Sequence, residues 1–412
     1  MPFALQAILW GVITLSIVVF LHEGGHFLAA RAFGVRVHEF MFGLPGPKIG
    51  FKHGDTLYGV TAIPFGGYNK IAGMDGDVTN INLQPVLVAV TQGARPVSAA
   101  EIAEQFALDE EEAKVVLDTL VDWSALSYDK ESRTWSPELA PDDPDALFAK
   151  AKEHTYQALS FWQRTVVLLS GIVVNIIFAL LVFTVLLSVW GQQVALNKVA
   201  PVTGGPALAA GIAKGDRIIR IEGTKTETFD DIITALSHTK PGQTVTVTLA
   251  PDRQVTLTLA ENPDDAKLAY LGIEAVPEYQ RLPLPRAIVQ SFSYLKLTVQ
   301  GILGFFTPGK FTESVNNSAS IVGIAVIAAD VVKTSAVDYA WLVAAISLSL
   351  GLMNLLPIPP LDGGKVVIEG IGAVRRRPLS LRATTAASAA GLLLLVTFMV
   401  YVMGHDIFRI VK

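Results

Sequence analysis

Apolar side chains occupy almost every position over long stretches of this chain, without the regular polar positions that mark one face of a soluble helix. Four stretches are long enough to cross a hydrocarbon core about 30 Å thick. They comprise residues 3–30, 162–190, 339–356 and 384–403, of which the third is the shortest. The pattern predicts a polytopic α-helical membrane protein with about four transmembrane helices.

A different pattern follows the first span, where short β-prone runs alternate with glycine and proline over residues 35–74. These runs predict hairpins. The hairpins form either a cytosolic β-meander or a re-entrant β loop that dips into the bilayer, and the apolar character of the run favours the second. An exposed strand edge there could pair with an extended peptide.

Residues 75–157 form a soluble insertion between the first two spans. Helical spacing at 98–106 and 109–123, followed by a predicted small hairpin over 126–136, is similar to a winged helix. Residues 100–145 hold fourteen acidic side chains against three basic ones, and the second helix opens with four consecutive acidic residues. Phosphate groups would be repelled, so we expect no nucleic-acid binding. A partner-binding or spacer module is the expectation.

After the second span the pattern becomes that of a soluble α+β domain over residues 194–275. Residues 211–223 read as a strand with a turn at each end, a helix is predicted at 229–236, and strands follow at 243–249 and 254–259. This order resembles a PDZ domain in the circular order of bacterial proteases, a fold whose groove takes a chain end or extended segment by strand addition. A tethered β-rich domain without a ligand is the alternative.

The segment from 280 to 337 is predicted to lie outside the membrane or on its outer surface. Residues 287–306 have the pattern of an amphipathic surface helix. Residues 321–332 are apolar but interrupted by Asp330, so neither stretch is counted as a span. Counting one of them would reverse the orientation of the third span.

The composition supports a membrane protein. Of 412 residues, 51% are hydrophobic and 17% charged, with a mean hydropathy of +0.45. The net charge of −5 is small and argues against a nucleic-acid partner. There are no cysteines, which excludes disulfides and thiolate ligands, so any metal must be held by His, Asp or Glu.

Basic residues set the expected orientation. Four follow the first span and four follow the third, so both loops are predicted to be cytoplasmic. They are Arg31, Arg36, Lys48 and Lys52, and Arg375, Arg376, Arg377 and Arg382. The segment from 191 to 338 and both termini are then outside the cytoplasm. No cationic run precedes the first span, so we expect a retained helix rather than a cleaved signal peptide.

The first span contains a metal-ligand pattern, HEGGH at residues 22–26. On a helix His22 and His26 are one turn apart and point the same way, so both imidazoles can bind one metal ion. Glu23 lies beside them and can act as a general base on water. The alternative is a surface helix with two solvated histidines, but the flanking residues are apolar on all sides.

The third span ends in a run of prolines, Pro357, Pro359 and Pro360, followed by Asp362. Backbone carbonyls freed by proline at membrane depth are tolerated around a polar cavity or where protein covers them. Taken alone, Asp362 reads as an Asp-Gly turn just outside the membrane. Combined with His22 and His26, it would complete a three-ligand set with a fourth position open for water.

These two motifs resemble those of the site-2 protease family of intramembrane zinc metalloproteases, in its bacterial, PDZ-containing branch. HEGGH at 22–26 and NLLPIPPLDG at 354–363 correspond to the family's two motifs, in the same order. The resemblance implies Zn²⁺ bound by His22, His26 and Asp362, with Glu23 as the base. It covers most of the chain except the acidic insertion.

The resemblance also implies residues that contact the substrate. Asn354 is similar to a family residue that holds substrate backbone near the zinc. The re-entrant loop of the family ends in a run similar to the one here. The substrate-binding candidates are Asn354, Pro357, Pro359, Gly66, Gly67 and Tyr68. The family also has a Gly-x-x-x-Asn pattern like Gly171 to Asn175, which we expect to be scaffold beside the site.

The predicted function is site-2 cleavage of a single-span membrane protein, similar to an anti-sigma factor, in regulated intramembrane proteolysis. The expected location is a bacterial cell membrane, in contact with lipid, with the active site toward the cytoplasm and the PDZ-like domain outside, where it binds or excludes the outer part of the substrate. The alternatives are a non-catalytic PDZ adaptor with a structural metal and a metal transporter. Structural zinc usually has four protein ligands, and a transporter usually has ionisable groups in several spans.

The predicted layout has ten segments. They are transmembrane segments 1–34, 158–190, 338–357 and 384–404, the β region 35–74, the insertion 75–157, the outer segments 194–275 and 280–337, the cytoplasmic loop 358–383 and the tail 405–412.

Overall fold

The computed structural model describes residues 2–74, 83–93, 95–137, 144–263, 265, 267–377 and 379–411. The chain divides into two compact units. Unit 1 comprises Met1–Phe183 and Ser291–Lys412, and unit 2 comprises Thr184–Gln290. The start of the acidic insertion, residues 75–82, lies outside the described residues.

Four of the described helices are long and apolar enough to cross a membrane, as predicted. They are α1 (Phe3–Ala32), α6 (Phe161–Val189), α12 (Ala336–Asn354) and α14 (Leu381–Val411). Helix α14 continues beyond the predicted end of its span at 404. Its polar residue Asp406 is buried and accepts a hydrogen bond from the backbone N–H of Ser320, 2.6 Å away, which accommodates a carboxylate in this helix.

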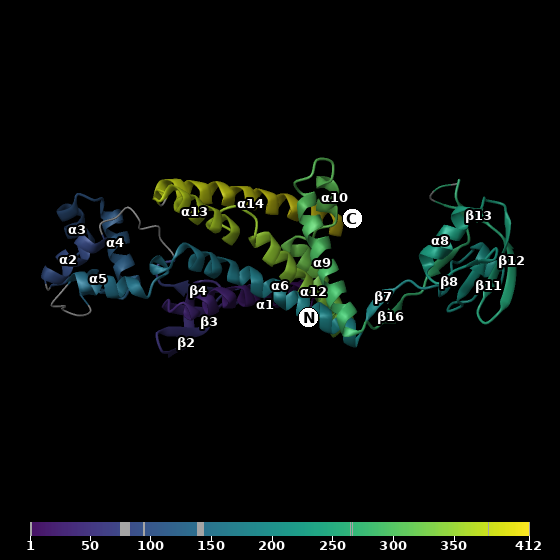
Figure 1. The fold of residues 1–412 in the computed structure, drawn as a ribbon, viewed down its shortest axis with the longest axis horizontal. Coiled ribbons are helices and arrows are strands. Elements are labelled where there is room, and N and C mark those ends of the chain that lie inside the picture. Colours follow the sequence, from purple (N-terminus) through teal and green to yellow (C-terminus); the bar gives the residue numbers. More distant parts are fainter. Residues whose placement is uncertain are drawn as a thin grey trace. The chain divides into compact units, whose positions relative to one another are not determined.

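Small residues bring the helices of unit 1 close together. A side-chain carbon at Gly25 of α1 would lie 2.5 Å from the carbonyl oxygen of Ser170 on α6, and one at Gly351 of α12 would lie 3.2 Å from Cβ of Asn175. Such glycines allow close helix approach in membranes. Figure 1 shows α1 and α6 running alongside each other. Asn175 is fully buried in this contact.

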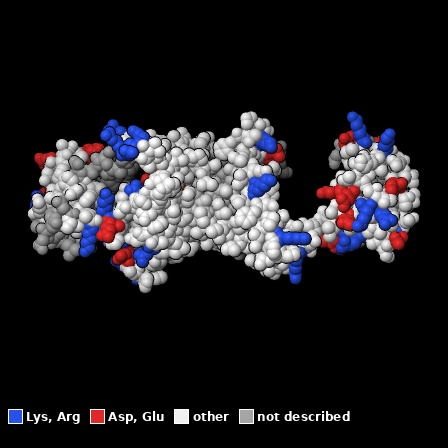
Figure 2. All heavy atoms as spheres, viewed as in Figure 1, with Lys and Arg blue, Asp and Glu red and all other residues white. Residues whose placement is uncertain are grey.

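Four further helices among the described residues follow the strands of unit 2 in the chain, and the first of them begins within unit 2. They are α9 (Leu284–Gly304), α10 (Phe311–Asn316), α11 (Ile321–Thr334) and α13 (Asp362–Arg375). Helix α11 packs on α1, where a side-chain carbon at Gly11 would lie 2.6 Å from Cβ of Ala325. With 14 residues, α11 is too short to cross a bilayer. Figure 2 shows few charged side chains over the long apolar helices of this unit.

A four-stranded sheet follows α1. Its strands are β1 (Val37–Phe42), β2 (Lys48–His53), β3 (Thr56–Thr61) and β4 (Gly67–Ile71), in the order β2-β3-β1-β4. The predicted hairpins are found only in part. Strands β2 and β3 form one, but β1 pairs in parallel with β3 and antiparallel with β4. The β1–β2 connection contains two prolines, which lack amide donors, and β2 lies beyond β3.

The described part of the insertion packs around its own apolar core. Its elements are α2 (Leu83–Gly93), α3 (Ala99–Phe106), α4 (Glu110–Asp122), β5 (Leu126–Asp129), β6 (Thr134–Pro137) and α5 (Pro144–Glu153), with the 3₁₀ turn η1 (Tyr156–Ala158) after it. Capping boxes begin α3 and α4, at Ser98 with Glu101 and at Asp109 with Glu112.

Asp122, at the end of α4, joins the insertion to the sheet. Its Oδ2 accepts a hydrogen bond from the backbone N–H of Gly73, 2.7 Å away, and its carboxylate lies 3.4 Å from Nε2 of His38 on β1 and 3.7 Å from Nζ of Lys70 on β4. Burial raises the pKa of the Asp122 carboxyl, but the nearby His38, the hydrogen bond from the Gly73 N–H and the charge of Lys70 outweigh it and leave the pKa below its usual value.

Unit 2 is rich in short strands around a separate apolar core. Its main sheet has the order β10-β9-β11-β12, and three further strand pairs are β13-β14, β15-β8 and β16-β7. Its strands are β7 (Gln192–Val194), β8 (Val199–Pro201), β9 (Ile218–Ile221), β10 (Thr224–Lys225), β11 (Thr244–Leu249), β12 (Arg253–Thr258), β13 (Ala260–Glu261), β14 (Ala269–Tyr270), β15 (Ile273–Ala275) and β16 (Glu278–Gln280). Its complete helices are α7 (Pro206–Ala209) and α8 (Phe229–Ser237), and α8 and β14 border a cavity of about 340 Å³.

Candidate metal centre

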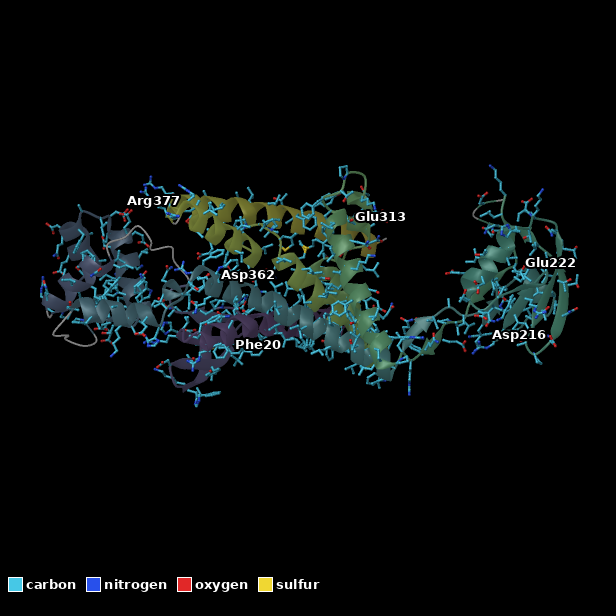
Figure 3. The ribbon with its side chains drawn as sticks, in the orientation of Figure 1. Phe20, Asp216, Glu222, Glu313, Asp362 and Arg377 are labelled. Atoms are coloured by element: carbon cyan, nitrogen blue, oxygen red, sulfur yellow. The ribbon has the colours of Figure 1, made fainter. Side chains whose placement is uncertain are left out.

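Three side chains from α1 and α13 converge inside unit 1. Nε2 of His22 lies 2.9 Å from Oδ2 of Asp362, Nε2 of His26 lies 3.2 Å from the same oxygen, and the two Nε2 atoms are 3.2 Å apart. All three residues are buried. Figure 3 shows Asp362 within the helical body and Arg377 beyond the far end of α13. The structure thus brings together residues that are 340 positions apart in the sequence.

The tautomer of His26 is determined by its neighbour on α6. Its Nδ1 lies 2.8 Å from the carbonyl oxygen of Val167, and because a carbonyl can only accept a hydrogen bond, this nitrogen donates. In the neutral ring Nε2 then carries a lone pair, which faces His22 and Asp362. A backbone partner of this kind is typical of a metal-binding histidine. Nδ1 of His22 is buried without a hydrogen-bond partner among the described residues.

The turn between α12 and α13 places Asp362. Helix α12 ends at Asn354, and Asp362 is the first residue of α13. The two glycines after it have no room for a side chain, since a carbon at Gly363 would lie 2.3 Å from the carbonyl oxygen of Leu355 and one at Gly364 would lie 2.4 Å from the nitrogen of Pro359. Asp362 is therefore held at a buried helix start rather than in an exposed turn.

The geometry fits a divalent cation. Donor atoms around a tetrahedral zinc ion are about 3.3 Å apart when each is about 2.0 Å from the metal. The three atoms here form a triangle with sides of 2.9, 3.2 and 3.2 Å. A buried carboxylate between two imidazoles favours a positive charge beside it, which a divalent cation would supply. Three ligands leave one coordination position for water or substrate.

Helix α6 closes one side of this centre with a glycine. A side-chain carbon at Gly171 would lie 2.6 Å from Nε2 of His26 and 2.9 Å from Cε1 of His22. Both distances are below normal contact, so only glycine leaves the imidazoles in place. The Gly171–Asn175 pattern predicted as scaffold therefore directly borders the predicted ligands.

Glu23 lies next to His22 on α1 and is half-buried. Its Oε2 accepts a hydrogen bond from Nδ2 of Asn69, 2.7 Å away on β4, and the same nitrogen lies 3.0 Å from the backbone oxygen of Glu23. The sequence-based interpretation missed Asn69. The available signal was an asparagine inside a β-prone run, where this residue type is depleted.

The predicted substrate-binding residues fall into three groups. Gly66 and Gly67 lie where the chain enters β4 beside α1: the N–H of Gly66 donates to Oγ of Ser16 over 2.9 Å, and a carbon at Gly67 would lie 3.5 Å from Cα of Phe20, an ordinary contact. Phe20 is labelled in Figure 3. Pro357 and Pro359 lie in the turn before Asp362.

Tyr68 and Asn354 have partners other than the metal centre. The hydroxyl of Tyr68 donates to Oε2 of Glu39 over 2.7 Å. Burial, together with this hydrogen bond, raises the pKa of Tyr68 to about 12, so the phenol keeps its proton. Nδ2 of Asn354 donates to the carbonyl oxygen of Leu350 one turn earlier in α12, over 3.0 Å. The contact of either side chain with a substrate stays a prediction.

Comparison with known proteins identifies the family. The sequence profile described as Peptidase family M50 matches residues 10–398. The chain belongs to this family. A relative from Mesorhizobium japonicum is 31% identical to this chain over 417 residues, and the match covers 96% of each of the two chains. The metalloprotease MmpA of Caulobacter vibrioides is 29% identical, covering 96% of this chain and 94% of its own.

A relative from a third organism is similar over its whole length. The zinc metalloprotease RasP of Geobacillus kaustophilus is 27% identical to the M50 peptidase over 417 residues, covering 98% of both chains. The predicted recognition of this protease family is therefore confirmed. The similarity extends through the acidic insertion and unit 2, because the aligned regions cover nearly the whole chain.

Proposed function

We propose that this M50 peptidase is an intramembrane zinc endopeptidase that carries out site-2 cleavage of a single-span membrane protein. One observation carries the proposal: three buried ligand atoms converge beside an acidic side chain, within a bundle that includes four helices suited to a membrane. The names of the relatives support zinc, since RasP is named a zinc metalloprotease.

The metal ligands in this proposal are Nε2 of His22, Nε2 of His26 and Oδ2 of Asp362. Zinc bound there would supply a Lewis acid that polarises the scissile carbonyl and acidifies water. Glu23 is the general base: its carboxylate takes the proton from the attacking water and passes it to the leaving amine. Oε2 of Glu23 is hydrogen-bonded to Asn69, so Oε1 is the oxygen available for this transfer.

A substrate helix has to unwind before its backbone can be cut, because a helical peptide bond is shielded by hydrogen bonds and side chains. Strand β4 is an edge strand of its sheet and passes directly beside Glu23. We propose that it pairs with the extended substrate segment. At the other edge of the sheet, Ile49 and Phe51 are 82% and 68% exposed, which supports a re-entrant loop in contact with lipid.

The orientation in this proposal follows the basic residues. Arg375 lies at the end of α13, Arg376 and Arg377 follow it, and Figure 2 shows Lys and Arg side chains gathered there. That end is cytoplasmic in a bacterial cell membrane, with the metal centre toward the cytoplasm. Unit 2 is the extracytoplasmic PDZ-like domain, and its cavity beside α8 would bind or exclude the outer part of an anti-sigma-like substrate.

The rival functions make different demands on the same residues. An adaptor with a structural metal has no need for a carboxylate beside three ligands. A transporter needs ionisable groups along a path, but the buried Asp406 of α14 is hydrogen-bonded at the start of α11. Both features favour the peptidase.

The decisive test is cleavage of a membrane-anchored substrate in detergent by the wild type and by Glu23→Gln. We expect Glu23→Gln to bind one zinc per chain but to lose cleavage by at least about a hundredfold, because the base is removed while the ligands stay. The matched control is Glu313→Gln, an exposed position on α10. Retained cleavage in Glu23→Gln, or loss of zinc with it, would contradict the roles assigned to Glu23 and the ligands.

A further inference from the structure

Asn69 is the residue of the sheet whose side chain reaches the predicted base. Its Nδ2 lies 2.7 Å from Oε2 of Glu23 and 3.0 Å from the backbone oxygen of Glu23. A backbone carbonyl only accepts hydrogen bonds, so the amide must present its nitrogen here and not its oxygen. The two N–H groups of one amide can thus hold two oxygens of the same glutamate.

The strand is built to aim this one side chain at α1. Side chains alternate along a strand, and the neighbours of Asn69 are used elsewhere, Tyr68 by Glu39 and Lys70 by Asp122. Two residues earlier, a side-chain carbon at Gly67 would lie in ordinary contact with Phe20, 3.5 Å from its Cα, so β4 runs directly beside α1. Asparagine is unfavourable in a strand, and the hydrogen bonds from its amide to Glu23 offset that cost to the sheet.

The contact leaves the carboxylate of Glu23 with one held and one available oxygen. A glutamate side chain has several rotatable bonds, and without a partner it samples orientations in which neither oxygen faces the metal centre. Fixing Oε2 and the backbone oxygen through one amide restricts that freedom. The catalytic geometry is then present before the substrate arrives.

We propose that Asn69 is a positioning residue for peptide hydrolysis, orienting Glu23 so that Oε1 faces the reacting water. This inference rests on the proposed function. Asn69 acts through Glu23 and touches neither the metal ligands nor the substrate in this role. Its removal should therefore slow the chemical step while leaving metal binding and substrate affinity intact.

The test compares purified wild type with Asn69→Leu, which keeps the size of the side chain but cannot donate, and Asn69→Asp, which places a second carboxylate against Glu23. We expect kcat to fall about 10- to 100-fold in Asn69→Leu, the loss typical of a hydrogen bond to a charged group, with KM changed less than about twofold. Zinc content and melting temperature should match the wild type. The control is Lys52→Met, an exposed position on β2 at the other edge of the sheet, which should keep kcat within about twofold.

A double-mutant cycle separates positioning from a structural effect. Glu23→Asp shortens the base by one methylene, so its carboxylate no longer reaches the Asn69 amide. Adding Asn69→Leu to Glu23→Asp should then lower kcat by less than about twofold. The inference would be overturned if the losses in kcat were fully additive in the double variant, or if kcat were unchanged in Asn69→Leu. It would also be overturned if the loss in kcat were accompanied by a loss of bound zinc. Should Asn69→Leu fail to fold, Asn69→Ala gives the same readings, because it also removes the amide donor.

The two proposals fail in distinguishable ways. Equal cleavage by the wild type and Glu23→Gln would reject the proposed function, whatever Asn69 does. Cleavage that depends on Glu23 but is unaffected by Asn69→Leu would reject only the positioning role.

Discussion

At the scale of single residues, the metal centre is defined by groups that are unfavourable together without a cation. The buried carboxylate of Asp362 lies within 3.2 Å of two ring nitrogens, and the backbone of Val167 fixes the proton of His26 on its far side. Burial of such a set costs free energy unless a positive charge joins it. The three residues therefore favour a positive charge among them and offer a place for a divalent ion.

Asp362→Asn tests this preference directly. The amide is nearly the same size but carries no charge, so we expect zinc affinity to fall by more than about a hundredfold, beyond the roughly 10- to 100-fold loss usual for residues that only support metal ligands. Zinc content after dialysis against a weak chelator measures the effect. Asp330→Asn, on the exposed side of α11, is the control and should retain zinc. Full zinc occupancy in Asp362→Asn would exclude Asp362 as a ligand.

At the scale of elements, the centre depends on close contact between α1 and α6. Gly25 and Gly171 face each other across this contact, and the backbone of α6 takes the place that a side chain would otherwise fill next to the imidazoles. The same helix supplies the carbonyl of Val167 to His26. Helix α6 therefore forms one wall of the site, although it contributes no ligand.

Gly171→Ala tests this wall. The added methyl would lie 2.6 Å from Nε2 of His26, so the ring or the helix must move. We expect zinc affinity to fall about 10- to 100-fold, as when a metal-bound histidine loses its support, together with a loss of cleavage. Gly370→Ala on α13 is the matched control, because it meets nothing within 4 Å. There alanine should preserve activity and stabilise the helix by about 1 kcal/mol. Unchanged zinc affinity in Gly171→Ala would contradict the conclusion that α6 must pass close to the imidazoles at Gly171.

At the scale of the whole molecule, the acidic insertion is attached to the sheet that carries Asn69. Asp122 bonds the N–H of Gly73 and lies near His38 and Lys70, which belong to β1 and β4. Lys70 is the strand neighbour of Asn69. The junction between the insertion and the sheet therefore lies one residue away from the contact with the proposed base.

This junction should weaken in acid. The folded pKa of Asp122 is below its usual value, so its stabilising contribution is present at neutral pH and is lost as the pH falls below about 4, where the carboxylate takes up a proton. Asp122→Ala should lower the free energy of opening this junction by about 1.5–3 kcal/mol at neutral pH. Hydrogen-exchange protection of the Gly73 amide, corrected for intrinsic rates, measures both effects. Glu110→Ala, exposed at the start of α4, should leave protection unchanged. Protection that is independent of pH and of Asp122 would contradict this account.

Local sequence patterns predicted what local physics determines. The spacing of His22 and His26 follows from one helical turn, and the apolar runs follow from the thickness of a bilayer. Other features depend on contacts between distant residues. The parallel pairing of β1 with β3, the burial of Asp406 against Ser320 and the bond from Asn69 to Glu23 across 46 positions have no signature in neighbouring residues. The candidate ligands can therefore be read from local sequence motifs, whereas the residues that orient the site cannot.

Strands β7 and β16, the first and last strands of unit 2, are paired with each other. Gln192 lies opposite Gln280, and Val194 lies opposite Glu278. Chain entry and chain exit are consequently only about 4.8 Å apart at this ribbon. For protein engineering, this makes the intervening segment a replaceable cassette: a short turn can close the gap, and a different recognition module can be grafted there without changing the length of the helices on either side.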